Sequence, residues 1–106
     1  LILVKLTNKF VKKIGILSIT PPASNIWISS NGHYPFVGTD FARSRYTKKS
    51  NNFLREMCSQ KDISFIDVYN NYSDGNGMLL QGLSDGSVHI GNTTYVAEEL
   101  KRHIIL

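Results

Sequence analysis

The alternation of apolar and polar positions divides the first part of the chain into a predicted helix and a predicted strand. Residues Leu1–Lys13 carry apolar side chains three or four positions apart, which is the period of an amphipathic helix. Residues Ile14–Thr20 form a short, nearly continuous apolar run that Pro21 and Pro22 end, and such a run is typical of a strand buried on both faces. The stretch that follows, residues 23–38, contains several turn formers and predicts a long connection of the kind that often carries function.

The strongest helical pattern, Thr39–Gln60, lies in the middle of the chain. Thr39 is a good N-cap residue, and Asp40 suits the positive end of the helix dipole. The residues of the predicted apolar face recur at helical spacing: Ala42, Tyr46, Phe53, Leu54, Met57 and Cys58. We therefore expect this helix to pack on the rest of the chain through that face.

The last part of the chain predicts a strand, a loop and a helix. Ile63–Tyr69 is a second apolar run with the character of a buried strand, and Asn70–Leu83 is a polar segment with several glycines that we predict to be a loop. Asn92–Ile105 predicts the final helix, and its apolar face would hold Val96, Leu100 and Ile104. The predicted order is thus helix, strand, helix, strand, helix.

This order of elements predicts an α/β fold in which the two strands are parallel and joined by a right-handed crossover. Two strands make a sheet too small for three helices to cover. We therefore expect the apolar residues of the two strands to lack cover on one side: Ile16, Leu17, Phe65 and Ile66. We also expect residues 1–106 to be the C-terminal part of a single larger α/β domain, whose remaining strands precede Leu1.

Composition removes several classes of protein. The chain has 106 residues, of which 42% are hydrophobic and 19% charged, and these values exclude a disordered or collagen-like protein. No apolar run approaches the roughly 18 residues of a membrane helix, so we predict no membrane span. The single cysteine, Cys58, excludes a miniprotein held by intrachain disulfides.

Charge does not point to a nucleic-acid partner. The chain carries 12 Lys and Arg against 8 Asp and Glu, for a net charge of +4. A basic run at residues 43–49 surrounds Tyr46, and a nucleic-acid contact is one interpretation of it. We favour a solvated helix face, because acidic residues follow and the excess charge is small.

The segment with the most chemistry lies between the last predicted strand and the last predicted helix. Residues 83–91 read Leu-Ser-Asp-Gly-Ser-Val-His-Ile-Gly. Ligands bind at the carboxyl ends of strands in open α/β sheets. In an acyl-transfer triad, a His takes the proton of a nucleophilic Ser and returns it to the leaving group, while an Asp holds the imidazole tautomer. Asp85 and His89 are therefore the candidate catalytic residues.

On these residues the chain resembles the C-terminal half of SGNH (GDSL-type) hydrolases. That family has an Asp followed closely by a His just before its C-terminal helix, and Asp85-Gly86-Ser87-Val88-His89 stands in that place. The apolar run that ends at Pro21-Pro22, the helix around residues 45–54, the strand at residues 65–68 and the loop from Asp74 follow the family's order. The family usually has two residues between the Asp and the His, whereas this chain has three.

The resemblance implies a three-layer α/β/α fold with a flavodoxin-like parallel sheet and the activity of an ester hydrolase, such as an esterase or lipase. His89 would be the general base and acid of a Ser-His-Asp triad, and Asp85 would orient it. The implied substrate is an acyl ester of a small molecule or a glycan, including O-acetyl groups on carbohydrate, and no cofactor or metal is implied. The family's Gly-Asp-Ser, oxyanion-hole Gly and Gly-x-Asn-Asp motifs do not occur in the chain. The N-terminal half of the same domain would therefore be the partner that supplies them.

Other interpretations stay open. Asp-Gly before a helix is also a common turn, and Asp85 with His89 could ligate a metal, although two ligands make a poor site. The domain could be a catalytically inactive SGNH-like binding or structural module. It could also be another doubly wound protein, such as a nucleotide binder, with its glycine-rich loop upstream. A Gly-Asp-Ser motif before Leu1 would favour the hydrolase.

Three other side chains invite a functional interpretation. His33, among Trp27, Tyr34 and Phe36, either lines a substrate pocket or packs within an ordinary loop, and we favour the second. Cys58 lies on an apolar helix face, which predicts a core residue and not a nucleophile. His103 lies near the end of the last predicted helix, and we expect it to face solvent.

Overall fold

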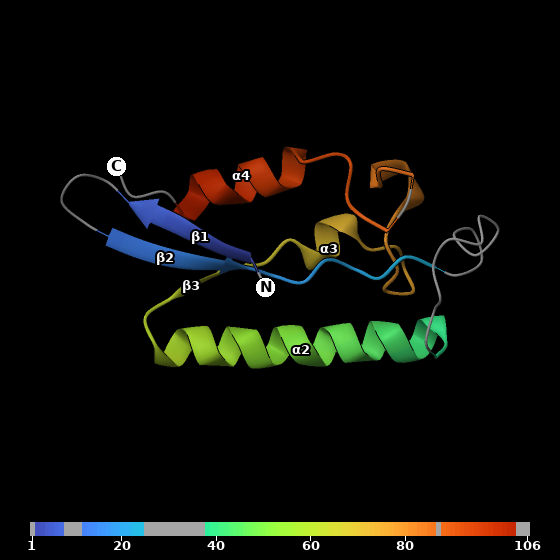
Figure 1. Ribbon diagram of the computed structural model, residues 1–106, viewed down its shortest axis with the longest axis horizontal. Coiled ribbons are helices and arrows are strands. Elements are labelled where there is room, and N and C mark those ends of the chain that lie inside the picture. Colours follow the sequence, from blue (N-terminus) through green and yellow to red (C-terminus); the bar gives the residue numbers. More distant parts are fainter. Residues whose placement is uncertain (1, 8–11, 25–37, 87, 104–106) are drawn as a thin grey trace.

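The computed structural model describes residues 2–7, 12–24, 38–86 and 88–103. Over these residues the protein is a small mixed α/β domain with a three-stranded sheet. In chain order the elements are β1 (Ile2–Thr7), β2 (Lys12–Leu17), α2 (Asp40–Gln60), β3 (Ser64–Ile66), α3 (Tyr69–Tyr72), the 3-10 helix η2 (Gln81–Leu83) and α4 (Thr94–His103). Helices α2 and α4 lie on opposite sides of the sheet (Figure 1).

The first element is a strand, and Lys12 and Lys13 begin a second one, so the helix predicted at Leu1–Lys13 is wrong over the described residues. Residues 1 and 8–11 of that prediction lie outside them. β1 pairs antiparallel with β2 in continuous register, from Ile2 opposite Leu17 to Thr7 opposite Lys12. Half of the residues of β1 are of the β-branched types that favour a strand over a helix. The apolar run of β2 then offers a pairing partner that outweighs the helical spacing.

The prediction of two parallel strands is confirmed. β2 and β3 pair in parallel, with Ile16 opposite Phe65. Both strands are shorter than predicted. Near their ends, backbone N–H groups donate to side-chain oxygens and not to the neighbouring strand. Ser18 Oγ accepts the Val68 N–H at 3.0 Å, and Asp67 Oδ1 accepts the Tyr69 N–H at 3.1 Å. Such local side-chain bonds compete with a strand ladder and turn the chain into α3.

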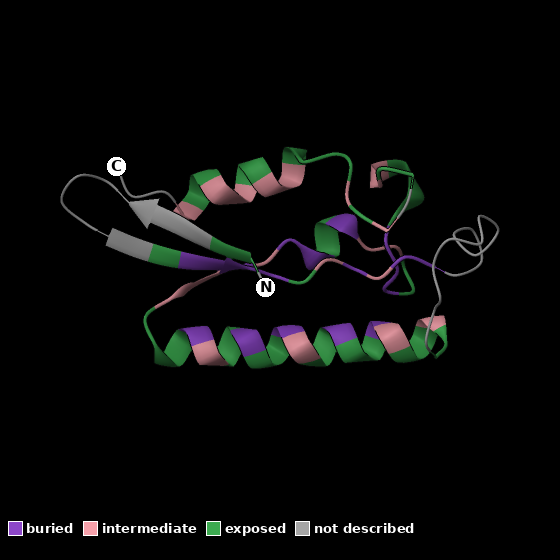
Figure 2. Ribbon diagram, in the orientation of Figure 1, coloured by how far each residue is buried: buried purple, intermediate pink, exposed green. Residues whose placement is uncertain are grey.

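Helix α2 forms where it was predicted, but part of its predicted inner face is wrong. Thr39 caps it, accepting the Ala42 N–H at 3.1 Å. The buried side of α2 faces the sheet (Figure 2) and consists of Ser44, Thr47, Asn51, Leu54 and Cys58. Ala42, Tyr46 and Phe53, predicted to face inward, are exposed. Part of this buried side is thus polar: Thr47 Oγ1 donates to the Arg43 carbonyl one turn earlier at 2.9 Å, and Asn51 bonds the chain after β2.

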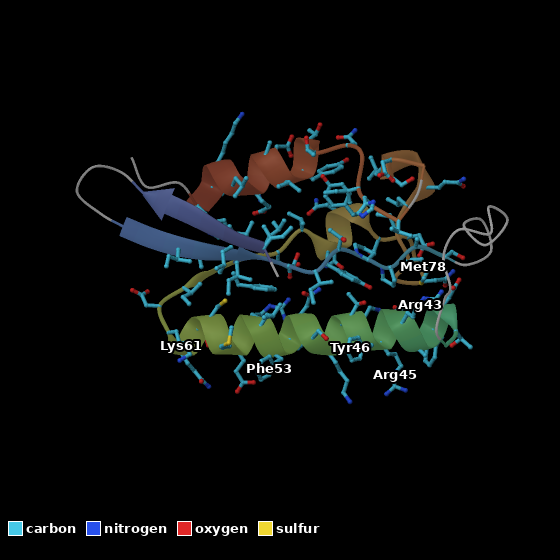
Figure 3. All side chains as sticks on the ribbon, in the orientation of Figure 1. Arg43, Arg45, Tyr46, Phe53, Lys61 and Met78 are labelled. Carbon is cyan, nitrogen blue, oxygen red and sulfur yellow. The ribbon has the colours of Figure 1, made fainter. Side chains whose placement is uncertain are left out.

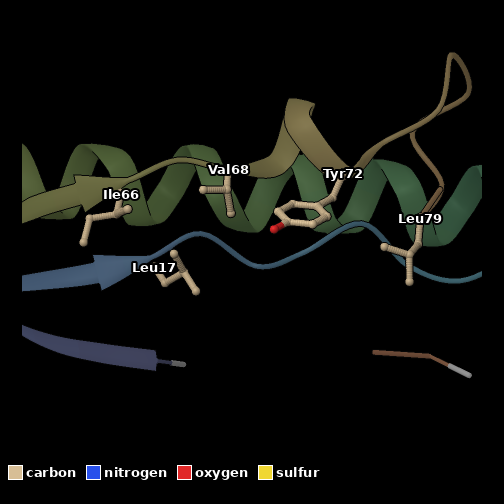
Figure 4. Close-up of a cluster of buried hydrophobic side chains, with 5 residues drawn as sticks. All are labelled: Leu17, Ile66, Val68, Tyr72 and Leu79. Carbon is tan, nitrogen blue, oxygen red and sulfur yellow. The ribbon is translucent and has the colours of Figure 1, made fainter. Parts of the chain in front are cut away.

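The core beneath α4 is formed by Leu17, Ile66, Val68, Tyr72 and Leu79 (Figure 4). Tyr72 and Leu79 belong to Asn70–Leu83, so the prediction of a polar loop there is wrong in part. A bridge between Ser73 and Leu79 and a bond from the Leu79 N–H to the Pro22 carbonyl at 2.8 Å turn this segment inward. The last predicted helix is confirmed and corresponds to α4. Its residues Val96 and Leu100 pack on this core, while Ile104 is outside the described residues.

The expectation that both strands lack cover is wrong for the residues it named. Ile16, Leu17 and Ile66 are buried, and Phe65 is half-buried, because α2 covers one face of the sheet and α4 the other. Among the described side chains of the sheet, the exposed apolar ones are instead Ile2, Leu3 and Ile14, toward the β1 edge. Within the described ranges, no helix combines the length and the apolarity needed to cross a bilayer.

Candidate functional site

The turn that carries Asp85 and His89 lies beyond the carboxyl ends of β2 and β3. The two strands run in the same direction, and the chain leaves both of them toward the end of the molecule where η2 and the start of α4 lie (Figure 1). This is the edge at which ligands bind in open α/β sheets. The prediction that placed the Asp-His segment on this side of the sheet agrees with the structure.

Backbone contacts join the two arms of the turn on either side of residue 87, which is outside the described residues. Ser84 and Ile90 form an antiparallel bridge, and the Asp85 N–H donates to the His89 carbonyl at 2.9 Å. Gly86 has φ +87°, a left-handed conformation that side chains disfavour. Gly91 passes so close to the other arm that a Cβ on it would lie 2.6 Å from the Ser84 oxygen. Both glycines therefore allow the chain to close tightly around the candidate pair.

Asp85 and His89 face each other across this turn. His89 Nδ1 lies 3.3 Å from Asp85 Oδ2, and the two side chains are 71% and 41% exposed, respectively. The three intervening residues, one more than in the family pattern, therefore still let the carboxylate reach the imidazole. With Nδ1 turned to the carboxylate, Nε2 is the ring nitrogen left to exchange a proton with a nucleophile.

Tyr72 anchors the far side of the turn. Its side chain is fully buried, and its hydroxyl donates to the Asn92 carbonyl at 2.7 Å. Its ring meets the Tyr95 ring edge-on, with the centroids 5.6 Å apart. Tyr72 was not predicted to belong to the site, and Gly91 was included in the segment 83–91 without a role. The signal for Gly91 was its residue type, because a glycine can mark a place where another part of the backbone approaches closely.

A separate cavity of about 650 Å³ opens beside the first turns of α2. Its described lining residues are Ser24, Asp40, Phe41, Lys48, Asp74, Gly75, Asn76 and Met78, and neither Asp85 nor His89 is among them. Ser24 Oγ donates to Asp40 Oδ2 at 2.6 Å, and Arg43 forms an ion pair with the same carboxylate. The Asp40 carboxylate in the cavity wall is thus already bonded by two neighbouring side chains.

A metal site has little basis in this geometry. In the part of the chain that the structure describes, no three His, Cys, Asp or Glu side chains cluster closely enough to hold an ion. Asp85 and His89 would be only two ligands, fewer than a typical zinc site requires.

The other candidate side chains are divided between described and undescribed residues. His33, Trp27, Tyr34 and Phe36 fall outside the described ranges. His103 is 30% exposed and ends α4 with Nε2 4.0 Å from Glu99 Oε2. Cys58 is buried as predicted, and burial raises the pKa of its thiol. A raised pKa disfavours the thiolate, which a nucleophilic cysteine needs.

Comparison of the chain with protein-family models, with curated proteins and with solved structures returned no match.

Proposed function

We propose that this chain contributes the Asp and His of a Ser-His-Asp triad in an ester hydrolase of the SGNH type. The observation that supports the proposal most directly is the contact of 3.3 Å between His89 Nδ1 and Asp85 Oδ2. It occurs at the sheet edge where an α/β hydrolase binds its substrate. The rest of the proposal rests on the resemblance of the residue pattern.

In this mechanism His89 Nε2 accepts the proton of a serine as its oxygen attacks the acyl carbon. The imidazolium then donates that proton to the departing alcohol, which leaves the acyl group on the serine. Water attacks this acyl group while His89 Nε2 accepts a proton from the water, and the imidazolium returns the proton to the serine oxygen as the carboxylic acid leaves. Asp85 stays ionised, keeps the neutral ring protonated at Nδ1 and stabilises the imidazolium. The serine and the oxyanion donors would come from the N-terminal half of the same domain, which would also complete a three-layer, flavodoxin-like sheet.

The substrate class proposed is an acyl ester of a small molecule or a glycan. An acetyl group on a carbohydrate hydroxyl is one such ester. A nucleophile that docks beside His89 would approach from solvent, because the His89 side chain is 71% exposed.

The same exposure supports a second candidate function, a binding or structural module without activity. Hydrogen bonds to a developing oxyanion are strong in a site that excludes water. A pair that solvent reaches on both members lacks that enclosure within the described residues.

Hydrolysis of p-nitrophenyl acetate by the protein that contains this chain with its nucleophile-bearing half tests the proposal. We expect His89→Ala to lower kcat at least about a thousandfold. The matched control is His103→Ala, which removes another histidine and should change the rate less than about twofold. An unchanged rate in His89→Ala would remove His89 from the mechanism. A wild-type protein inactive on acetyl, butyryl and O-acetyl-glycan esters would favour the inactive module.

A further inference from the structure

A groove beside α2 exposes apolar side chains. Ile19, Lys49, Ser50, Phe53 and Leu54 line a depression of about 340 Å³ between α2 and the segment after β2. Phe53 is 68% exposed and Ile19 40% exposed. Figure 3 places Phe53 on the side of α2 that points away from the sheet. We name this depression the Ile19 groove.

The sheet continues this apolar surface toward β1. Leu17 and Ile66 belong to the core beneath α4, so their neighbour Ile16 faces the α2 side. Leu3 is paired with Ile16 across the two strands, and Ile14 lies two residues before Ile16 in β2. Leu3 and Ile14 therefore lie on the same face of the sheet as Ile16. Their exposed fractions are 65% for Leu3 and 51% for Ile14. In Figure 4, α2 runs behind β3, and β1 lies on the other side of β2.

The uncovered surface has the dimensions of one more helix. Neighbouring strands lie about 4.8 Å apart and packed helices about 8–10 Å apart, so one helix covers about two strands. Because α2 covers the β3 side, a second helix would fit over β1 and β2. The chain advances about 17 Å from Ile14 to Ile19, which corresponds to about three helical turns.

Charge selects among possible occupants of this surface. α2 carries five cations, Arg43, Arg45, Lys48, Lys49 and Arg55, and two carboxylates, Asp40 and Glu56. Ion pairs engage Arg43 with Asp40 and Arg55 with Asp67. No side chain of the described residues forms an ion pair with Lys49 in the Ile19 groove. A second copy packed through α2 would bring like charges together, whereas an acidic partner would complement them.

We propose that the Ile19 groove and the exposed face of β1 and β2 bind an amphipathic helix of a partner polypeptide. The partner inserts an apolar anchor between Ile19 and Phe53 and places Asp or Glu beside Lys49. Laying the apolar face of a helix into such a groove is a recurrent mode of recognition. The binding does not depend on Asp85 or His89.

The test uses the 106-residue chain and two fluorescent helical peptides of about 18 residues. Both carry Leu at positions i, i+3, i+7 and i+11, and Glu flanks this stripe in one while Lys replaces every Glu in the other. Fluorescence anisotropy gives the affinities, and amide shifts in NMR spectra locate the contact. Phe53→Ser and Lys49→Glu alter the groove. Phe41→Ser is the control, since Phe41 is an equally exposed aromatic residue of α2 outside it.

We expect the Glu peptide to bind at least about tenfold more tightly than the Lys peptide, with shifts around Ile19, Lys49 and Phe53. Phe53→Ser should weaken binding about tenfold, Phe41→Ser should leave it unchanged, and Lys49→Glu should reverse the preference between the peptides. Equal affinity for both peptides, no binding, or shifts elsewhere would overturn the proposal. So would self-association in sedimentation, or binding to phosphatidylserine vesicles, that Phe53→Ser abolishes.

Discussion

Asn51 binds the backbone of Ile19 through both ends of its carboxamide. The Ile19 N–H donates to Asn51 Oδ1 at 2.8 Å, and Asn51 Nδ2 donates to the Ile19 carbonyl at 2.9 Å. The Asn51 side chain is buried, so water cannot readily replace these bonds. The carboxamide therefore acts as an additional strand partner just after β2 ends, and it joins α2 to the sheet.

Replacing Asn51 by Ala should destabilise the fold strongly. Both backbone groups of Ile19 would lose the partner that the buried carboxamide supplies, at a cost of about 1–3 kcal/mol in the free energy of unfolding. The matched control is Asn52→Ala on the next residue, which is exposed and accepts a hydrogen bond from Arg55 at 2.7 Å. Its effect should stay within about 0.5 kcal/mol. Urea unfolding measures both, and equal effects would contradict the role of Asn51.

The face of α2 illustrates what sequence patterns can and cannot predict. The pattern located this helix and its cap correctly, because capping and helical period are local properties. It assigned Tyr46 and Phe53 to the interior because they are apolar. The buried side instead follows another stripe of the same period, Ser44, Thr47, Asn51, Leu54 and Cys58. Its polar members are buried because each has a hydrogen-bond partner: Ser44 and Asn51 bond backbone groups of other segments, and Thr47 bonds a carbonyl of its own helix. A hydrophobicity pattern does not encode such partners.

The sequence allowed us to predict the two candidate catalytic residues, but not the residues that hold them in place. Asp85 and His89 stand out because their chemistry is encoded by residue type and closeness in sequence. Tyr72 reaches the site only through the tertiary packing of α3 against α4. The strand β1 was missed for the same reason, since its pairing with β2 outweighed a helical spacing.

Gly91→Ala should distort the turn that holds the candidate pair. The new Cβ would lie 2.6 Å from the Ser84 oxygen and 2.8 Å from the Asp85 Cα, both backbone atoms that cannot rotate away. We expect a loss of about 1–3 kcal/mol in unfolding free energy and shifted amide signals from residues 84–90. Gly82→Ala is the control, because nothing lies within 4 Å of a Cβ there. Unchanged spectra for Gly91→Ala would show that the turn is loosely held.

Tyr72→Phe should weaken the attachment of α4. It removes the hydroxyl that donates to the Asn92 carbonyl at 2.7 Å and keeps the ring contact with Tyr95. We expect about 1–2 kcal/mol less stability by urea unfolding, with faster amide exchange at the start of α4. Tyr46→Phe, at a position 74% exposed, should change neither quantity. Equal behaviour of the two variants would exclude Tyr72 as the anchor.

Cys58 should react slowly with thiol reagents in the folded protein. Burial raises the pKa of its thiol above the ordinary 9.0, so both access and thiolate content are low. We expect labelling by a disulfide reagent at pH 8 to require unfolding by urea. A variant combining Cys58→Ala with Ser59→Cys places the thiol at an exposed neighbouring position and should react at once. Rapid labelling of the wild type would show that the segment opens readily.

The same shift predicts a pH dependence of stability. As the pH rises past the ordinary pKa, the unfolded chain releases the thiol proton before the folded chain does. Stability therefore falls above about pH 9. Cys58→Ala removes this contribution, so its stability should fall less than that of the wild type between pH 8 and pH 10. Urea unfolding of both proteins at the two pH values makes the comparison, and parallel curves would contradict it.

Asp85→Asn should change the tautomer of His89. In the wild type, the carboxylate beside Nδ1 favours the neutral ring that carries its proton there, and this leaves Nε2 as the acceptor that a triad needs. The asparagine amide loses the charge and can present either an oxygen or an NH₂ group to the ring. The nitrogen chemical shifts of the imidazole above its titration range should then show a larger share of the Nε2-protonated form. Asp74→Asn, in a turn outside the pair, is the control. Identical tautomer populations in wild type and Asp85→Asn would mean that the contact of 3.3 Å does not orient the ring, and Asp85 would lose its role in the proposed triad.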